Sequence, residues 1–176
     1  MKKIILRTLI VVFALAIAVT PTLAASWTDK VTGGGWVQVD QDWGFSFTVS
    51  IKTDGTDVSG QMEYSRPSHP TFGPLDWHAT AECFGTGFID PWGAEYAVIG
   101  GPYSYQYNPA DEYHAEPWII AWVKEGSLDT NAGYGDGVRI RYHTQADAEY
   151  YCQNGGQPGG FFWATVTDGN FNIRNK

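Results

Sequence analysis

The amino-acid sequence predicts an all-β domain, an antiparallel β-sandwich or β-barrel of about 8–10 strands with little or no helix. Several stretches alternate apolar and polar residues with a period of two, which is typical of strands with one buried face. Glycine, proline and aspartate cluster between these stretches, where they favour tight turns. Aromatic residues make up 15% of the chain, and they favour strands over helices.

The first predicted strand is VTGGGWVQV, residues 31–39, in which three glycines precede Trp36. The Gly-Lys-Ser/Thr of a phosphate loop is missing, and no predicted helix follows as in a dinucleotide site. Glycine inside a strand usually marks a bulge or the close approach of another segment. We therefore expect residues 33–35 to make room for a large neighbour, such as a tryptophan from a facing sheet, and Trp36 to fill the interior.

The clearest alternation lies in residues 43–53, where the apolar side chains at positions 45, 47, 49 and 51 share one face. The TDGTD segment at residues 53–57 predicts a turn, because Asp-Gly adopts positive backbone angles readily. Residues 58–64 alternate again. Together these segments predict a β-hairpin.

The second half of the chain continues as short strands. Residues 118–124, WIIAWVK, are apolar on both faces and predict a central strand. Residues 102–117 are polar and rich in tyrosine, which predicts a loop, and residues 145–151 predict the one short helix. Further strands are predicted at residues 75–83, 85–89, 95–101, 138–143, 161–167 and 170–174.

A secretory leader is predicted at residues 1–24, followed by a single β-domain at residues 25–176. Three basic residues precede an apolar run, and small residues follow Pro21 at a cleavage site. The run is shorter than the ~20 residues of a membrane span, and no second run reaches that length. We expect a secreted protein, extracellular, on the cell surface or in the periplasm, without membrane insertion after removal of the leader. An uncleaved N-terminal anchor is the alternative.

The chain is acidic and contains two cysteines. Its 19 Asp and Glu against 11 Lys and Arg give a formal net charge of −8, which repels nucleic acid, so no nucleic-acid partner is expected. In an exported protein, Cys83 and Cys152 predict one disulfide. Closing a loop of about 70 residues stabilises a fold by roughly 4 kcal/mol in the chain-entropy model. Two buried free thiols are the alternative.

Two predicted strands carry charged residues along one face. On neighbouring strands such residues pair as a solvent-exposed ladder, whereas at a barrel mouth they would line a polar ligand pocket. In the pocket, His78 would act as a base and Glu82 or Asp76 would orient it. The candidate ligand-binding residues are Asp76, His78, Glu82, Arg139, Arg141 and His143.

Aspartates near the ends of two predicted strands suggest a calcium site, because carboxylate oxygens are ligands of Ca²⁺. They lack the twelve-residue EF-hand pattern, and Asp-Gly segments also form plain Asx turns. We expect no cofactor and no metal centre, with a calcium alternative that rests on Asp40, Asp42, Asp54 and Asp57.

Aromatic side chains in turns and loops form a second group of candidates. On a rigid β-scaffold they can stack on sugar rings or contact protein. Trp92 in a predicted turn and Tyr105 in a predicted loop are the binding candidates, and Tyr103, Tyr107 and Tyr113 lie in the same loop. The expected partner is a glycan, a cell-surface component or a second copy of the chain.

A series of short motifs follows one order along the chain: KVTGGGW at 30–36, WGFSFTV at 43–49, VSGQMEY at 58–64, GDGVRI at 135–140 and GNFNIR at 169–174. This order resembles a group of secreted bacterial and archaeal β-domains, sometimes called post-choice-of-anchor domains. Residues 123–137 and 145–160 depart from the pattern of that group. The resemblance implies a secreted β-domain and supplies no catalytic residues.

The sequence favours a non-catalytic extracellular β-module for adhesion, surface assembly or ligand binding. It has no Gly-x-Ser-x-Gly nucleophile motif, and no pair of carboxylates stands out as a glycosidase pair. One alternative is a small-ligand- or carbohydrate-binding barrel with hydrolytic activity, which a deep pocket lined by the charged candidates would favour. Another is a self-assembling subunit that donates residues 25–31 to a neighbouring copy as a strand.

Overall fold

The computed structural model describes residues 29–39, 41–89, 94–108, 116–126, 135–155 and 164–174. Within these ranges the chain forms antiparallel strands and one helix, α2 (Gln145–Asn154). The strands are β1 (Asp29–Gln38), β2 (Gly44–Thr53), β3 (Val58–Arg66), β4 (Leu75–Thr80), β5 (Cys83–Ile89), β6 (Ala94–Tyr107), β7 (Trp118–Lys124), β8 (Gly137–His143) and β9 (Ala164–Arg174). The all-β prediction is confirmed.

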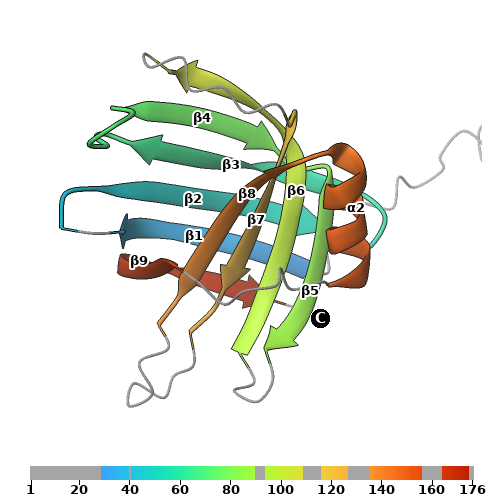
Figure 1. Cartoon of the computed structure of the whole chain (residues 1–176). Coiled ribbons are helices and arrows are strands. Elements are labelled where there is room, and N and C mark those ends of the chain that lie inside the picture. The colour runs from blue at the N-terminus through green and yellow to red at the C-terminus, as the bar shows by residue number, and fades with distance from the viewer. Residues whose placement is uncertain are drawn as a thin grey trace, which may run out of the picture.

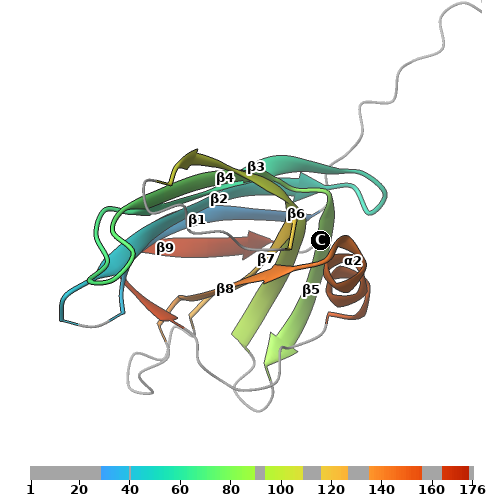
Figure 2. The same ribbon diagram turned by 45° about the horizontal axis from the view of Figure 1, so that its top comes forward.

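Eight of these strands close into a barrel. Their order is β4-β3-β2-β1-β9-β8-β7-β6, and pairing of β4 with β6 completes the circle. β5 is an additional strand that pairs with β6. In Figure 1 strands β1–β4 and β9 run across strands β5–β8, and Figure 2 shows the two groups as facing layers. Because the layers are hydrogen-bonded to each other at β4–β6 and at β8–β9, the fold is a barrel rather than two separate sheets.

Side chains fill the interior of the barrel. The inward face of β2 is the one predicted from its alternation, and Phe47, Val49 and Ile51 are each at most 3% exposed. They belong to one apolar cluster with Met62 of β3, Ile119 of β7 and inward residues of every other barrel strand. We call this the interior cluster. An eight-stranded barrel either fills with its own side chains or holds one small ligand, and the buried residues show that this one is filled along its length.

The glycines of β1 admit the backbones of both neighbouring strands. A Cβ atom at Gly35 would lie 2.2 Å from the carbonyl oxygen of Asp168 in β9, and one at Gly34 would lie 2.6 Å from that of Phe47 in β2. Gly33 also has a φ of +140°, which other residues rarely adopt. The predicted close approach is therefore present, but the neighbour is strand backbone and not a tryptophan.

Trp36 lies on the outer face of β1, so the expectation that it fills the interior is wrong. Its Nε1 donates a hydrogen bond to Oε1 of Gln38 at 3.0 Å, on the same outer face. Val31 and Val37, both 0% exposed, supply the inward side chains of this strand. The glycines between them have no side chains, so the sequence of β1 shows no alternation that would indicate which residues point inward.

β6 and β9 are longer than predicted. The predicted loop at residues 102–117 is a strand as far as Tyr107, because β6 leaves β7 at Pro102 and pairs with β4 from Tyr103 onward. The two strands predicted at residues 161–167 and 170–174 are one strand within the described residues. Gly169, with a φ of +115°, lies inside it, close to a shift in its register with β1.

The predicted helix extends to residue 154 and has defined ends. The Thr144 side chain accepts a hydrogen bond from the backbone N–H of Asp147 at 3.2 Å, which caps the first turn. Gly155 follows the last turn in the left-handed conformation, with a φ of 56°. In the described part of the chain, no helix has the length and apolar character needed to cross a membrane.

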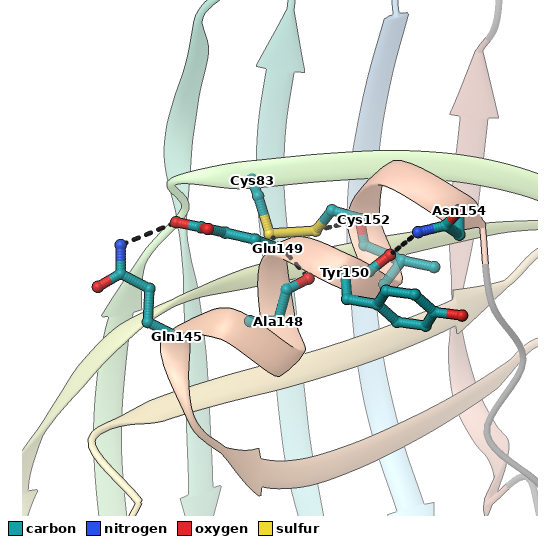
Figure 3. Close-up of a disulfide and its surroundings, with 8 residues drawn as sticks. Cys83, Gln145, Ala148, Glu149, Tyr150, Cys152 and Asn154 are labelled. Carbon is teal, nitrogen blue, oxygen red and sulfur yellow. Dashed lines mark hydrogen bonds between the residues drawn. A yellow bond between two sulfur atoms is a disulfide. The ribbon is translucent and has the colours of Figure 1, made fainter.

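α2 covers the outer face of the layer formed by β5–β8, beside β5 and β6 (Figure 1). The predicted disulfide is confirmed, and it joins Cys83 of β5 to Cys152 of α2 across 69 positions (Figure 3). A disulfide is typical of a protein that folds in an oxidising compartment. The helix lies so close that a Cβ atom at Gly100 of β6 would be 3.0 Å from Cβ of Ala148.

A second apolar cluster lies between α2 and the barrel wall. Its largest member is Trp122 of β7, which is 0% exposed although it points away from the barrel interior. β7 is therefore buried on both faces, as its continuous apolar run predicts. We call this group the outer cluster; its buried members are Tyr96, Val98, Trp118, Ile120, Trp122, Ala148 and Cys152.

Candidate functional site

The predicted charged residues lie on two strands that do not pair. β4 carries Asp76 and His78 and pairs with β3 and β6, whereas β8 carries Arg139 and Arg141 and pairs with β7 and β9. The expected ladder between the two strands does not form. These residues alternate with inward side chains such as Trp77, so they face away from the interior and line no pocket inside the barrel.

The histidines of this group make local contacts instead. His78 Nε2 lies 3.0 Å from the hydroxyl oxygen of Ser104 on the neighbouring strand β6. His143 Nδ1 lies 3.7 Å from a carboxylate oxygen of Asp147 in α2. Both contacts are at the surface and tie neighbouring elements together.

The calcium candidates do not gather at one place. Asp42 precedes β2 and Asp54 follows it, so a strand of 10 residues, ~30 Å at the usual rise, separates them. Asp54 forms the alternative Asx turn, because its Oδ1 accepts from the backbone N–H groups of Asp57 at 2.8 Å and Thr56 at 2.9 Å. These two hydrogen bonds, that of Asp57 first, lower the pKa of Asp54. Asp40 lies outside the described residues.

A groove of about 500 Å³ lies beyond the end of β2, between its turn to β3, the start of β5 and α2. The three charged residues that line it are all acidic: Asp29, Glu82 and Glu149. Glu82 is the one predicted site residue found there. Among the described residues, no group of three or more His, Cys, Asp or Glu side chains is arranged to hold a metal ion.

Tyr105 lies inside a strand and not in a loop. It belongs to a set of inward aromatic side chains at the opposite end of the barrel, where β3 and β8 finish and β4 begins. Trp92 and Tyr113 lie outside the described residues. We call this set the aromatic end; it consists of Tyr64, Trp77, Tyr103, Tyr105 and Tyr142.

The rings of the aromatic end contact one another in a continuous chain. Tyr64 stacks on Trp77 with ring centroids 5.2 Å apart and an interplanar angle of 4°, and Tyr103 approaches Trp77 edge-on at 6.1 Å. Tyr103 also contacts Tyr105 at 5.4 Å and Tyr142 at 5.3 Å. The hydroxyl oxygens of Tyr103 and Tyr105 are 3.5 Å apart. Four strands thus contribute to one aromatic surface.

All four tyrosines of the aromatic end are partly exposed, although they pack against the interior cluster. Side chains inside a hydrogen-bonded barrel reach solvent only where the wall stops. β6 extends past its last pair with β7, Pro102 with Trp118, and its tyrosines lie on that extension. These tyrosines are therefore the part of the barrel interior that reaches solvent at this end, while Trp77 behind them is buried.

Because of a register shift between β4 and β6, one tyrosine at the end of β6 points inward and the next points outward. Trp77 pairs with Tyr105 and Asp76 pairs with Tyr107, so Gln106 is an extra residue, as in a β-bulge. Directly paired residues share a face of the sheet. Tyr107 therefore points outward with Asp76 and is 51% exposed, whereas Tyr105 points inward with Trp77.

Trp77 carries a buried donor without a partner. The side chain is 1% exposed, and its Nε1 has no hydrogen-bond partner in the part of the chain that the structure describes. Leaving such a donor unsatisfied costs roughly 1–3 kcal/mol, so buried polar groups are nearly always paired. An exception within an aromatic surface that reaches solvent suggests a group reserved for a ligand.

The hydroxyl of Tyr103 is held in its neutral form. Burial is the main cause that raises its pKa, and the hydrogen bond with Tyr105 adds to the effect. Tyr103 therefore offers a neutral hydroxyl group rather than a phenolate.

Sequence reasoning missed Trp77, Tyr64 and Tyr142 as site residues. Each was placed in a predicted strand, and the side chain of each points into the barrel near the end of its strand. Inward tyrosines at strand ends are the signal that could have found them, because their hydroxyl groups need a polar contact.

Comparison with protein-family models, with curated proteins and with solved structures finds no match to this chain. The resemblance to post-choice-of-anchor domains therefore stays a prediction.

Proposed function

We propose that this protein is an exported, non-catalytic binding module whose ligand binds at the aromatic end. The observation that carries the proposal is the set of inward tyrosines that stay partly exposed around the unpartnered indole of Trp77. Rings with a few polar groups among them are typical of small-molecule sites. The outward position of the charged candidates gives no support to a reaction site inside the barrel.

Export rests on the leader predicted at residues 1–24 and agrees with the disulfide, which persists in oxidising compartments. The strand-donation alternative receives less support. Val31 already pairs with Ile51 of β2 and Ile173 of β9, so residues 29–31 are part of their own barrel.

Binding can be tested with a library of glycans and small molecules applied to the purified protein with its disulfide intact. For each binder, we expect Tyr105→Ala to weaken affinity about tenfold, because a lost aromatic contact of about 1.4 kcal/mol corresponds to that factor. Tyr107→Ala is the matched control, since this ring lies two residues away and points outward, and it should leave affinity unchanged. Equal affinity of both variants and the wild type, or no binder at all, would contradict the proposal.

A further inference from the structure

The unpartnered indole of Trp77 selects the chemistry of its ligand. An N–H group donates and cannot accept, so a ligand that satisfies it has to bring an acceptor atom. Aromatic rings also attract cations such as quaternary ammonium groups. These groups carry no acceptor and would leave the donor of Trp77 unsatisfied.

The rings around this donor suit a ligand with both an apolar face and hydroxyl groups. Tyr103, Tyr105 and Tyr142 present ring faces and edges that pack against C–H groups. Tyrosine hydroxyl groups both donate and accept hydrogen bonds. Sugar rings offer C–H faces and many hydroxyl groups in one small molecule.

The overall charge of the chain disfavours anionic ligands. The whole chain has a formal net charge of −8. Like charges in such an arrangement repel an approaching anion. A carboxylate or phosphate would supply an acceptor for Trp77 but would meet this repulsion.

We infer that the aromatic end binds a neutral saccharide and that Nε1–H of Trp77 donates a hydrogen bond to one of its oxygen atoms. The inference rests on the proposed function, because it names the ligand class of the same end of the barrel. It names Trp77 as a hydrogen-bond donor to the ligand and predicts that charged ligands bind more weakly than neutral ones.

Access to this donor requires a tyrosine ring to move. Trp77 is 1% exposed, with Tyr64 stacked on it and Tyr103 edge-on to it. The 3.5 Å between the hydroxyl oxygens of Tyr103 and Tyr105 is at the outer limit of a hydrogen bond, so this contact is weak and a movement of either ring would sacrifice little by breaking it. Rotamer changes of this kind are common when ligands bind.

The test follows the indole N–H resonance of Trp77 by nuclear magnetic resonance of the ¹⁵N-labelled protein. The chain has eight tryptophans, and the resonance that disappears in Trp77→Phe identifies the correct one. Neutral trisaccharides of glucose, galactose, mannose and N-acetylglucosamine are titrated beside anionic trigalacturonate and the cation tetramethylammonium, which has no acceptor atom. We expect at least one neutral trisaccharide to shift this resonance to saturation, and trigalacturonate and tetramethylammonium to leave it in place.

Trp77→Phe should bind the same trisaccharide up to tenfold more weakly, since it keeps a ring and loses one hydrogen bond. If that variant does not fold, nuclear Overhauser contacts of the indole N–H with ring protons of Tyr64 and Tyr103 identify the Trp77 resonance, and the wild-type titration decides. Binding without a shift of the Trp77 resonance, tighter binding of tetramethylammonium or trigalacturonate, or no binding of any neutral trisaccharide would each overturn the inference. The pair Tyr105→Ala and Tyr107→Ala then still reports separately on the proposed function.

Discussion

The interior cluster and the outer cluster share strands β6 and β7 but end in different ways. The outer cluster is closed by α2, which the Cys83–Cys152 disulfide ties to β5. The interior cluster is closed by the barrel wall along its sides and reaches solvent as partly exposed tyrosines at the aromatic end. A covered apolar surface serves stability, whereas an accessible one that contains an unpartnered donor is suited to binding.

The interior cluster should dominate stability. Phe47 is 0% exposed and packs against Phe171 of β9, across the glycines of β1, with ring centroids 6.2 Å apart. Phe47→Ala should lower the free energy of unfolding by about 3–5 kcal/mol, through lost burial and the cavity left behind. Urea denaturation measures this change, and Thr48→Ala on the outer face of the same strand should change it by less than about 0.5 kcal/mol. A loss near that of the control would mean that the interior is not the main core.

The outer cluster should depend on its covalent tie. Replacing both Cys83 and Cys152 by serine should lower the free energy of unfolding by about 2–4 kcal/mol, because the unfolded chain loses a closed loop. Hydrogen exchange should accelerate first at the amides of α2, while amides of β2 stay protected. Equal loss of protection in both elements would show that the barrel itself relies on the disulfide.

The sequence predicts the interior cluster well wherever side chains alternate. In β2 the phase of Phe47 and Val49 is visible, because each apolar residue is followed by a small polar one. In β1 the phase is invisible, because Gly33, Gly34 and Gly35 have no side chains to bury. Trp36 was therefore assigned to the wrong face, although the need for glycine was predicted correctly.

The remaining errors come from contacts between distant segments. Pro102 suggested the end of a strand, yet β6 continues because β4 replaces β7 as its partner at that point. Tyr64 and Trp77 are partners in the consecutive strands β3 and β4, but only the pairing of β4 with β6, which closes the barrel, brings them beside Tyr103 and, through it, Tyr142. The charged residues of β4 and β8 show the converse, since similar patterns on two strands do not place the strands side by side.

The smallest predicted change in stability comes from removing the N-cap of α2, and it tests whether the helix can loosen without opening the outer cluster. Thr144 caps α2, and Thr144→Ala should cost about 1 kcal/mol, since the N–H of Asp147 loses its acceptor. Thr144→Ser keeps a capping hydroxyl and should retain most of the stability. Exchange should accelerate in the first turn of α2 alone, because Cys152 near the other end remains tied to β5. If the amides of Val98 and Trp122 accelerate as well, the whole helix, and not only its disulfide-linked end, holds the outer cluster closed.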